Sequence, residues 1–127
     1  MRPGAKGWPT DVCVPISRLA ESILETKRDI QREDLLAPIV GHVGDGNYHL
    51  SFIVDPDDAE EMERAKRVNE RMVVRAIELG GTCTGEHGIG FGKIEFLRTE
   101  HGEAVSVMRQ LKQALDPDNL MNPGKMF

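Results

Sequence analysis

The strongest constraint on the fold is a glycine-rich turn between two apolar segments. Residues 39–43 and 48–54 are rich in the β-branched and aromatic side chains that favour strands. Gly44-Asp45-Gly46-Asn47 joins them, and an Asp-Gly pair tolerates the positive φ that a tight hairpin turn requires. The sequence therefore predicts an antiparallel hairpin, around which the rest of the chain must pack.

Two amphipathic helices flank this hairpin. We expect the first to begin at Ser17 as N-cap and to end before Pro38, and the second to open at residues 55–58 and to stop at Gly80-Gly81. Apolar residues recur at helical spacing at Ile16, Leu19, Ala20, Ile23, Leu24 and Ile30, and again at Met62, Ala65, Val68, Met72, Val73, Ala76 and Leu79. Each stripe predicts one helix face packed on the sheet.

Short β-prone segments at residues 11–15 and 82–84 complete the order strand, helix, strand, strand, helix, strand. That order predicts an α+β, ferredoxin-like βαββαβ fold with an antiparallel sheet. We expect an irregular lead-in over residues 1–10, one domain over 11–115 that closes with helices near 93–97 and 102–115, and a loop-like tail over 116–127.

Composition excludes several classes of function. The 127 residues carry a formal charge of −5 and no basic run, which argues against nucleic-acid binding. No apolar stretch approaches the roughly 20 residues that span a bilayer. Cys13 and Cys83 have no CxxC spacing, so we interpret them as core or half-buried thiols of a protein from a reducing compartment.

The hairpin brings two of the four histidines together. A tight turn at residues 45–46 places His42 directly opposite His49, with Cβ atoms about 4.5–5.5 Å apart. Two imidazoles at that separation can share one divalent ion. Alternation points His49 away from the core face that Tyr48, Leu50, Phe52 and Val54 form. The spacing favours a metal site over the alternative, a surface pair of histidines.

A second glycine-framed segment, Gly85-Glu86-His87-Gly88, offers further ligands. Glu86 is the best candidate for a carboxylate that would join the two histidines on a metal. His87 could be a third nitrogen ligand, a general base or a structural residue, and spacing alone does not separate these roles. We interpret His101 as a solvated surface histidine and Asp45 as a turn former.

Four segments carry a family resemblance, and they occur in the matching order. They are residues 10–19, 41–49, 82–90 and 115–125. Together they resemble the C-terminal region of FAD-linked D-2-hydroxyacid dehydrogenases, of the D-lactate dehydrogenase (cytochrome) and glycolate oxidase flavin-subunit type. The resemblance implies that this chain is the cap domain, and that most of the FAD is bound by an N-terminal domain outside it.

The resemblance also implies roles for single residues. His42, His49 and Glu86 would hold a divalent metal, Zn or Mn, and His87 would be the base near the flavin. Asn122 would lie near the FAD, in the tail that contacts the FAD domain. The implied reaction takes a small 2-hydroxy acid to a 2-oxo acid by proton transfer to His87 and hydride transfer to flavin N5.

The implied partners are the FAD domain and an electron acceptor, cytochrome c or a quinone. The implied location is the cytoplasm or the periphery of the inner membrane, and the mitochondrion in a eukaryote. Ser51 and Thr10 replace the Asn and Lys of some related 2-hydroxyglutarate enzymes, which argues against a longer dicarboxylate substrate. A region expected to supply a substrate arginine is missing, so we expect the isolated chain not to turn over.

Two functions of other classes stay open on the sequence. The chain could be a free-standing module that binds a divalent metal and has no redox role. It could also be a metal-assisted hydrolase with His87 as base.

Overall fold

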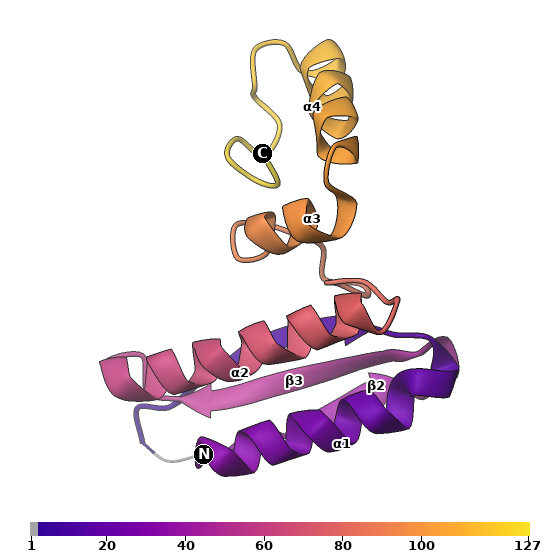
Figure 1. The fold of residues 1–127 in the computed structure, drawn as a ribbon. Coiled ribbons are helices and arrows are strands. Elements are labelled where there is room, and N and C mark those ends of the chain that lie inside the picture. The colour runs from indigo at the N-terminus through magenta and orange to yellow at the C-terminus, as the bar shows by residue number, and fades with distance from the viewer. Residues whose placement is uncertain (1–2) are drawn as a thin grey trace. The chain divides into compact units, whose positions relative to one another are not determined.

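A three-stranded antiparallel sheet and two long helices form the larger part of the computed structural model, which describes residues 3–127 (Figure 1). The elements in chain order are β1 (Lys6–Cys13), α1 (Ile16–Arg32), β2 (Ile39–His42), the 3-10 turn η1 (Val43–Asp45), β3 (Asn47–Val54), α2 (Ala59–Glu78), α3 (Ile94–His101) and α4 (Ala104–Leu115). The sheet order is β1-β3-β2, so β3 is its central strand. The predicted α+β class and the antiparallel sheet are confirmed.

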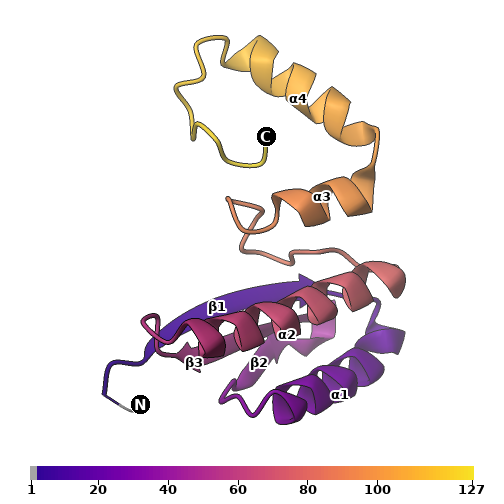
Figure 2. The ribbon, with the colours of Figure 1, turned by 60° about the vertical axis from the view of Figure 1, so that its left-hand side comes forward.

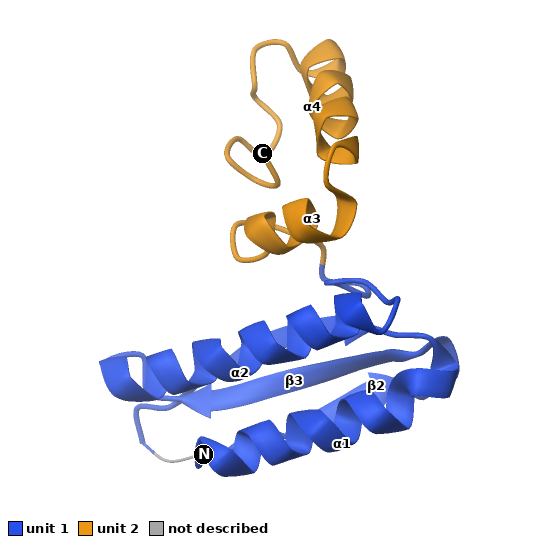
Figure 3. Ribbon diagram, in the orientation of Figure 1, with its two compact units in different colours: residues 1–87 blue, residues 88–127 orange. Residues whose placement is uncertain are grey.

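The chain separates into two compact units, residues 1–87 and residues 88–127 (Figure 3). The sheet and the first two helices belong to the first unit, and α3, α4 and the tail belong to the second. The domain boundaries expected at residues 11 and 115 stay a prediction.

In the first unit, α1 and α2 lie side by side over one face of the sheet (Figure 2). Alternate residues of β3 supply the core beneath them, and Tyr48, Leu50, Phe52 and Val54 are buried as the alternation predicts. The apolar buried residues of α2 are Ala65, Val68, Met72, Val73 and Ala76. One face of the sheet thus packs in the core, and the side chains of the opposite face do not contribute to this core.

The first strand begins earlier than predicted. β1 starts at Lys6, so the expectation of irregular structure up to residue 10 is wrong for residues 6–10. Pro9 is tolerated because β1 is an edge strand, where a missing backbone N–H costs little. Trp8 packs on Phe52 with ring centroids 5.3 Å apart, which extends the core face to the start of the strand.

The fourth predicted strand is reduced to one β-bridge. Cys13 and Thr82 exchange two backbone hydrogen bonds, at 3.3 and 2.8 Å. Beyond this bridge the N–H groups of Gly85 and Glu86 turn to the side chain of Asp11. Because a side chain takes these donors, the strand ladder does not continue.

Helix α1 also differs from its prediction. Pro15, and not Ser17, is the N-cap residue, and Ser17 lies inside the first turn. The buried stripe is Leu19, Ser22, Thr26, Asp29 and Ile30, while Ile16 and Leu24 are exposed. The apolar pattern predicted Leu19 and Ile30 correctly but missed the other three members, which are polar residues with partners on β3 and α2.

Helix α2 stops at the predicted glycines but begins at Ala59, directly after the segment 55–58 that was expected to open it. The Asp58 side chain caps it by accepting a hydrogen bond from the Glu61 amide at 3.0 Å. Gly80, with φ +79°, follows its last residues and stops it.

The second unit holds two shorter helices and a tail without helix or strand, as expected for residues 116–127. Asp116 organises the start of this tail, because its carboxylate accepts hydrogen bonds from the amides of Leu120 and Met121, both at 2.9 Å. Along residues 3–127, every helix lacks the combination of length and apolar character needed to cross a bilayer.

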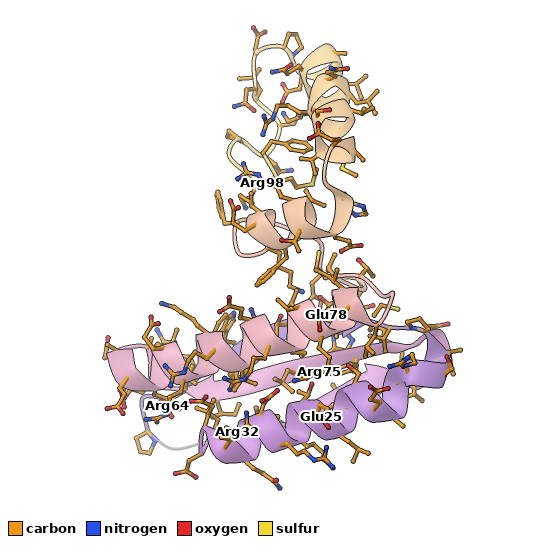
Figure 4. All side chains as sticks on the ribbon, in the orientation of Figure 1. Glu25, Arg32, Arg64, Arg75, Glu78 and Arg98 are labelled. Atoms are coloured by element: carbon orange, nitrogen blue, oxygen red, sulfur yellow. The ribbon has the colours of Figure 1, made fainter. Side chains whose placement is uncertain are left out.

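A buried polar network joins the two helices to the sheet. The Tyr48 hydroxyl lies 2.8 Å from Ser22 Oγ and 3.0 Å from Thr26 Oγ1, and burial raises the pKa of Tyr48. Arg75 reaches from α2 towards α1 (Figure 4), donates to Thr26 Oγ1 at 3.0 Å and pairs with Asp29. Since each polar group has a partner, the network fixes how the helices sit on β3.

The Tyr48 hydroxyl gives a first test of this network. Replacing Tyr48 by Phe removes one buried hydroxyl and leaves that of Ser22 without its partner, so we expect the free energy of unfolding to fall by about 1–2 kcal/mol. Urea denaturation followed by circular dichroism measures the change. In the double variant Ser22→Ala/Tyr48→Phe part of the loss should be recovered. Wild-type stability in Tyr48→Phe would contradict the network.

Glu33 gives a second test, through pH. Hydrogen bonds from Arg67 and Arg71, at 2.7 Å each, lower the pKa of Glu33 to about 2 from its ordinary value of 4.5. Because the folded pKa is depressed, the stabilisation is complete above pH 4.5 and is lost as pH falls from there towards 2. We expect Glu33→Gln to lower the melting temperature at pH 7, and its difference from wild type to shrink across that window.

A matched control is Glu25→Gln. Glu25 pairs with Arg28 on the exposed surface of α1, where ion pairs contribute little. Its melting temperature should stay close to that of the wild type at every pH. A Glu33→Gln effect of the same size at pH 7 and near pH 2 would contradict the assignment.

Candidate functional site

The candidate site lies on the sheet face that points away from the helices. His49 belongs to this face, since its neighbours Tyr48 and Leu50 point into the core. Asp11 of β1 is directly opposite His49 on one side, and Val40 of β2 is opposite it on the other. A central strand with partners on both sides thus holds His49 in a fixed position.

The register of the hairpin differs from its prediction. His42 pairs with Asn47, and not with His49, because the loop is formed by η1 and Gly46 rather than by a tight turn at residues 45–46. Gly46 adopts φ +76°, and a Cβ there would lie 2.0 Å from the Val14 carbonyl oxygen. The pairing is shifted by two residues, and an even shift keeps side chains on the same face.

His42 and His49 are therefore diagonal neighbours on one face. Their ring centroids lie 5.6 Å apart in an edge-on arrangement. Glu86 completes the group, with Oε1 3.0 Å from His49 Nε2 and 3.7 Å from His42 Nε2. The structure thus brings together the three residues that the sequence proposed as ligands.

The chemistry of this donor set fits a divalent metal. One ligand atom from each of His42, His49 and Glu86 lies within 4.8 Å of the other two. Two imidazole nitrogens and a carboxylate oxygen are donors that Zn or Mn accepts. The side chain of His49 is 12% exposed, whereas those of His42 and Glu86 are 62% and 53% exposed. One side of the donor set is thus open to solvent and to a substrate.

His87 lies beside this donor set. Its ring centroid is 4.9 Å from that of His49, and its Nδ1 is 3.7 Å from Asp11 Oδ1. Asp11, His49 and His87 form a second group whose possible ligand atoms lie close together. The Asp11 carboxylate already accepts several hydrogen bonds from the protein, so we favour His42, His49 and Glu86 as the metal ligands.

A turn over residues 84–87 presents Glu86 and His87 to the same site. Glycine is required at position 85, because a Cβ there would lie 1.8 Å from Asn47 Nδ2. Sequence reasoning missed Asn47 and Asp11, which contact this turn. An acidic residue within a β-branched strand, two residues before Cys13, was the available signal for Asp11.

The cysteines take no part in this donor set. Cys13 donates a hydrogen bond to the Asp45 carbonyl oxygen at 3.2 Å, and Cys83 is buried. Burial, followed by the charges of Asp45 and Asp11, raises the pKa of Cys13. A thiol that resists ionisation is a poor metal ligand and a poor nucleophile.

The two remaining residues of interest belong to the second unit. Asn122 lies in the tail with φ +48°, and its carbonyl oxygen accepts a hydrogen bond from the Lys125 amide at 3.2 Å. Its expected proximity to FAD stays a prediction. His101 is the last residue of α3, and its Nε2 lies 3.4 Å from Glu100 Oε1. Its side chain is 38% exposed.

Comparison with known proteins identifies the family. Residues 1–126 match the family described as FAD linked oxidases, C-terminal domain. The chain is 54% identical to the probable mitochondrial D-lactate dehydrogenase of Danio rerio, over 100% of this chain and 26% of that protein. It is 52% identical to mitochondrial D-lactate dehydrogenase [cytochrome] 1 of Saccharomyces cerevisiae, over 97% of this chain and 21% of that protein.

A bacterial relative extends the range of this similarity. Glycolate oxidase subunit GlcD of Bacillus subtilis is 40% identical, over 92% of this chain and 25% of that protein. The chain thus spans about a quarter of the length of these curated relatives. With the family matched over almost all of its length, this chain belongs to the FAD-linked oxidases, as their C-terminal domain.

Proposed function

We propose that this chain is the substrate- and metal-binding part of a flavin-dependent dehydrogenase that oxidises D-2-hydroxy acids, with D-lactate to pyruvate as its reaction. The observation that carries the proposal is the convergence of His42, His49 and Glu86 on one face, with the His87 ring 4.9 Å from that of His49. The names of the relatives, D-lactate dehydrogenase and glycolate oxidase subunit, support a small 2-hydroxy acid as substrate.

His42, His49 and Glu86 would hold the metal, Zn or Mn. When bound, a divalent ion supplies positive charge that attracts the substrate carboxylate and lowers the pKa of the substrate hydroxyl. The exposed sides of His42 and Glu86 leave space for a small anion to approach. This arrangement accounts for anion binding by a chain whose net charge is −5.

His87 would act as the base. Its ring is 39% exposed and lies next to His49, so it can reach a substrate held at the donor set. The ring nitrogen would accept the hydroxyl proton of the substrate as hydride leaves the α-carbon. FAD, held mainly by a domain outside this chain and contacted by Asn122, supplies the hydride acceptor.

The proposal extends to the surroundings of the enzyme. The names of the eukaryotic relatives place them in mitochondria, and we propose the same location if this chain comes from a eukaryote. Cytochrome c or a quinone would reoxidise the flavin. Because FAD binding is assigned mainly to another domain, we propose that the 127-residue chain alone oxidises no D-lactate.

Metal binding is the first test of the site. We expect His42→Ala and Glu86→Ala each to weaken Zn²⁺ or Mn²⁺ binding to the 127-residue chain at least tenfold, because each removes one of three donors. Calorimetric titration and elemental analysis measure affinity and content. His101→Ala, which alters a histidine of the second unit, should bind as the wild type does. Unchanged metal content in both site variants would disprove the ligand assignment.

Catalysis by His87 is the second test, made in the flavoprotein that carries this chain. We expect His87→Asn to lower kcat for D-lactate by roughly 10²- to 10⁴-fold, the usual contribution of a general base, with metal content unchanged. His101→Asn is the matched control and should keep the wild-type kcat. Steady-state assays with an artificial electron acceptor measure both. A His87→Asn enzyme with full kcat would rule out this residue as the base.

A further inference from the structure

Asp11 is a buried carboxylate for which the proposed chemistry has no use. It lies in β1, is 0% exposed, and faces the site from directly opposite His49. Taking an ionised carboxylate out of water costs free energy unless other groups satisfy its oxygens. The hydrogen-bond partners of the Asp11 carboxylate therefore indicate its role.

Most of these partners come from one short turn. Asp11 Oδ2 accepts hydrogen bonds from three consecutive backbone amides, those of Gly85 and Glu86 at 2.7 Å and that of His87 at 3.3 Å. Consecutive amides that converge on one oxygen form an anion-binding concavity of the kind found around phosphates. Here the anion is a side chain of the same protein.

The second oxygen of Asp11 holds the ends of the same turn. Oδ1 accepts a hydrogen bond from Thr84 Oγ1 at 3.1 Å and lies 3.7 Å from His87 Nδ1. The two oxygens together contact all four residues from Thr84 to His87.

This turn decides where two functional side chains point. In an extended strand Glu86 and His87 would point to opposite faces, because side chains alternate. With their amides folded around Asp11, Glu86 reaches His49 at 3.0 Å while the His87 ring lies 4.9 Å from the His49 ring. Without the carboxylate, three amides would lose their shared acceptor.

We infer that Asp11 is a positioning residue, whose carboxylate folds residues 84–87 into the turn that presents Glu86 to the metal and His87 to the substrate. The inference rests on the proposed function for the roles of Glu86 and His87. The folding of the turn by Asp11 can be tested independently of those roles.

The test compares Asp11→Asn with two control variants in the 127-residue chain. Asn keeps the size of the side chain but replaces one charged acceptor by an amide, and loss of a partner that orients a ligand typically costs 10- to 100-fold in metal affinity. We expect Co²⁺ to bind Asp11→Asn at least tenfold more weakly and with a changed visible absorption spectrum. Thr84→Val, which leaves the Oδ2 hydrogen bonds intact, should lose less than threefold.

Tyr48→Phe separates positioning from general destabilisation. It weakens the fold from the opposite face of the sheet and should keep the wild-type affinity and spectrum for Co²⁺. If Asp11→Asn keeps them as well, the inference is overturned.

Amide NMR decides the inference even where metal binding gives no answer. In the wild type we expect the amide protons of Gly85 and Glu86 to be shifted downfield and protected from exchange with solvent, and both features to be lost in Asp11→Asn. If the wild-type chain binds no Co²⁺, the proposed metal site is disproved, and the amide signals of Gly85 and Glu86 still test whether Asp11 folds the turn. If Asp11→Asn does not fold, unprotected amides at these positions in the wild type would refute the inference.

Discussion

The alternation of side chains along β3 is the constraint on which the rest of the structure depends. β3 is paired on both sides, so it can neither rotate nor slip by one residue without breaking two ladders. Tyr48, Leu50 and Phe52 are committed to the core, which leaves His49 on the opposite face. The strand portion of the core and the central histidine of the donor set are therefore opposite faces of one eight-residue strand.

The polar network on the helix face of the sheet and the turn of residues 84–87 on the opposite face stabilise the sheet from both sides. On the helix face, the hydroxyl of Tyr48 ties β3 to α1, and Arg75 ties α1 to α2. On the other face, Asp11 ties β1 to the segment that carries Glu86. Both connections consist of buried polar groups that satisfy one another, which favours one arrangement over many.

The sequence predicts those parts of the fold that follow from local patterns. The core residues of β3, an aspartate cap within residues 55–58 and the stop at Gly80 obey alternation, capping and glycine rules, and these predictions are confirmed. Only the apolar members of the α1 stripe were predicted, because Ser22, Thr26 and Asp29 are buried through partners distant in sequence. No helical periodicity of apolar residues can reveal a buried polar face.

The candidate site, like the fold, could be predicted from the sequence only in part. The meeting of His42 with His49 could be predicted although the register was wrong by two residues, because an even displacement preserves the face. The position of Glu86 beside these histidines could be proposed, but the group that holds Glu86 in that position could not be deduced. That group is the carboxylate of Asp11, and a contact across 75 residues has no local signature.

The same long-range contact has a consequence for the order of folding. The hydrogen bonds from the amides of residues 85–87 to Asp11 close chain segments of 74 to 76 residues. Closing so long a segment costs much conformational entropy unless the intervening hairpin and helices have already formed. We therefore expect the turn that carries Glu86 to form late in the folding of the first unit. In the proposed function, a chain in which this turn has not formed would offer two histidines but no carboxylate donor, so tight metal retention would report that the first unit has folded completely.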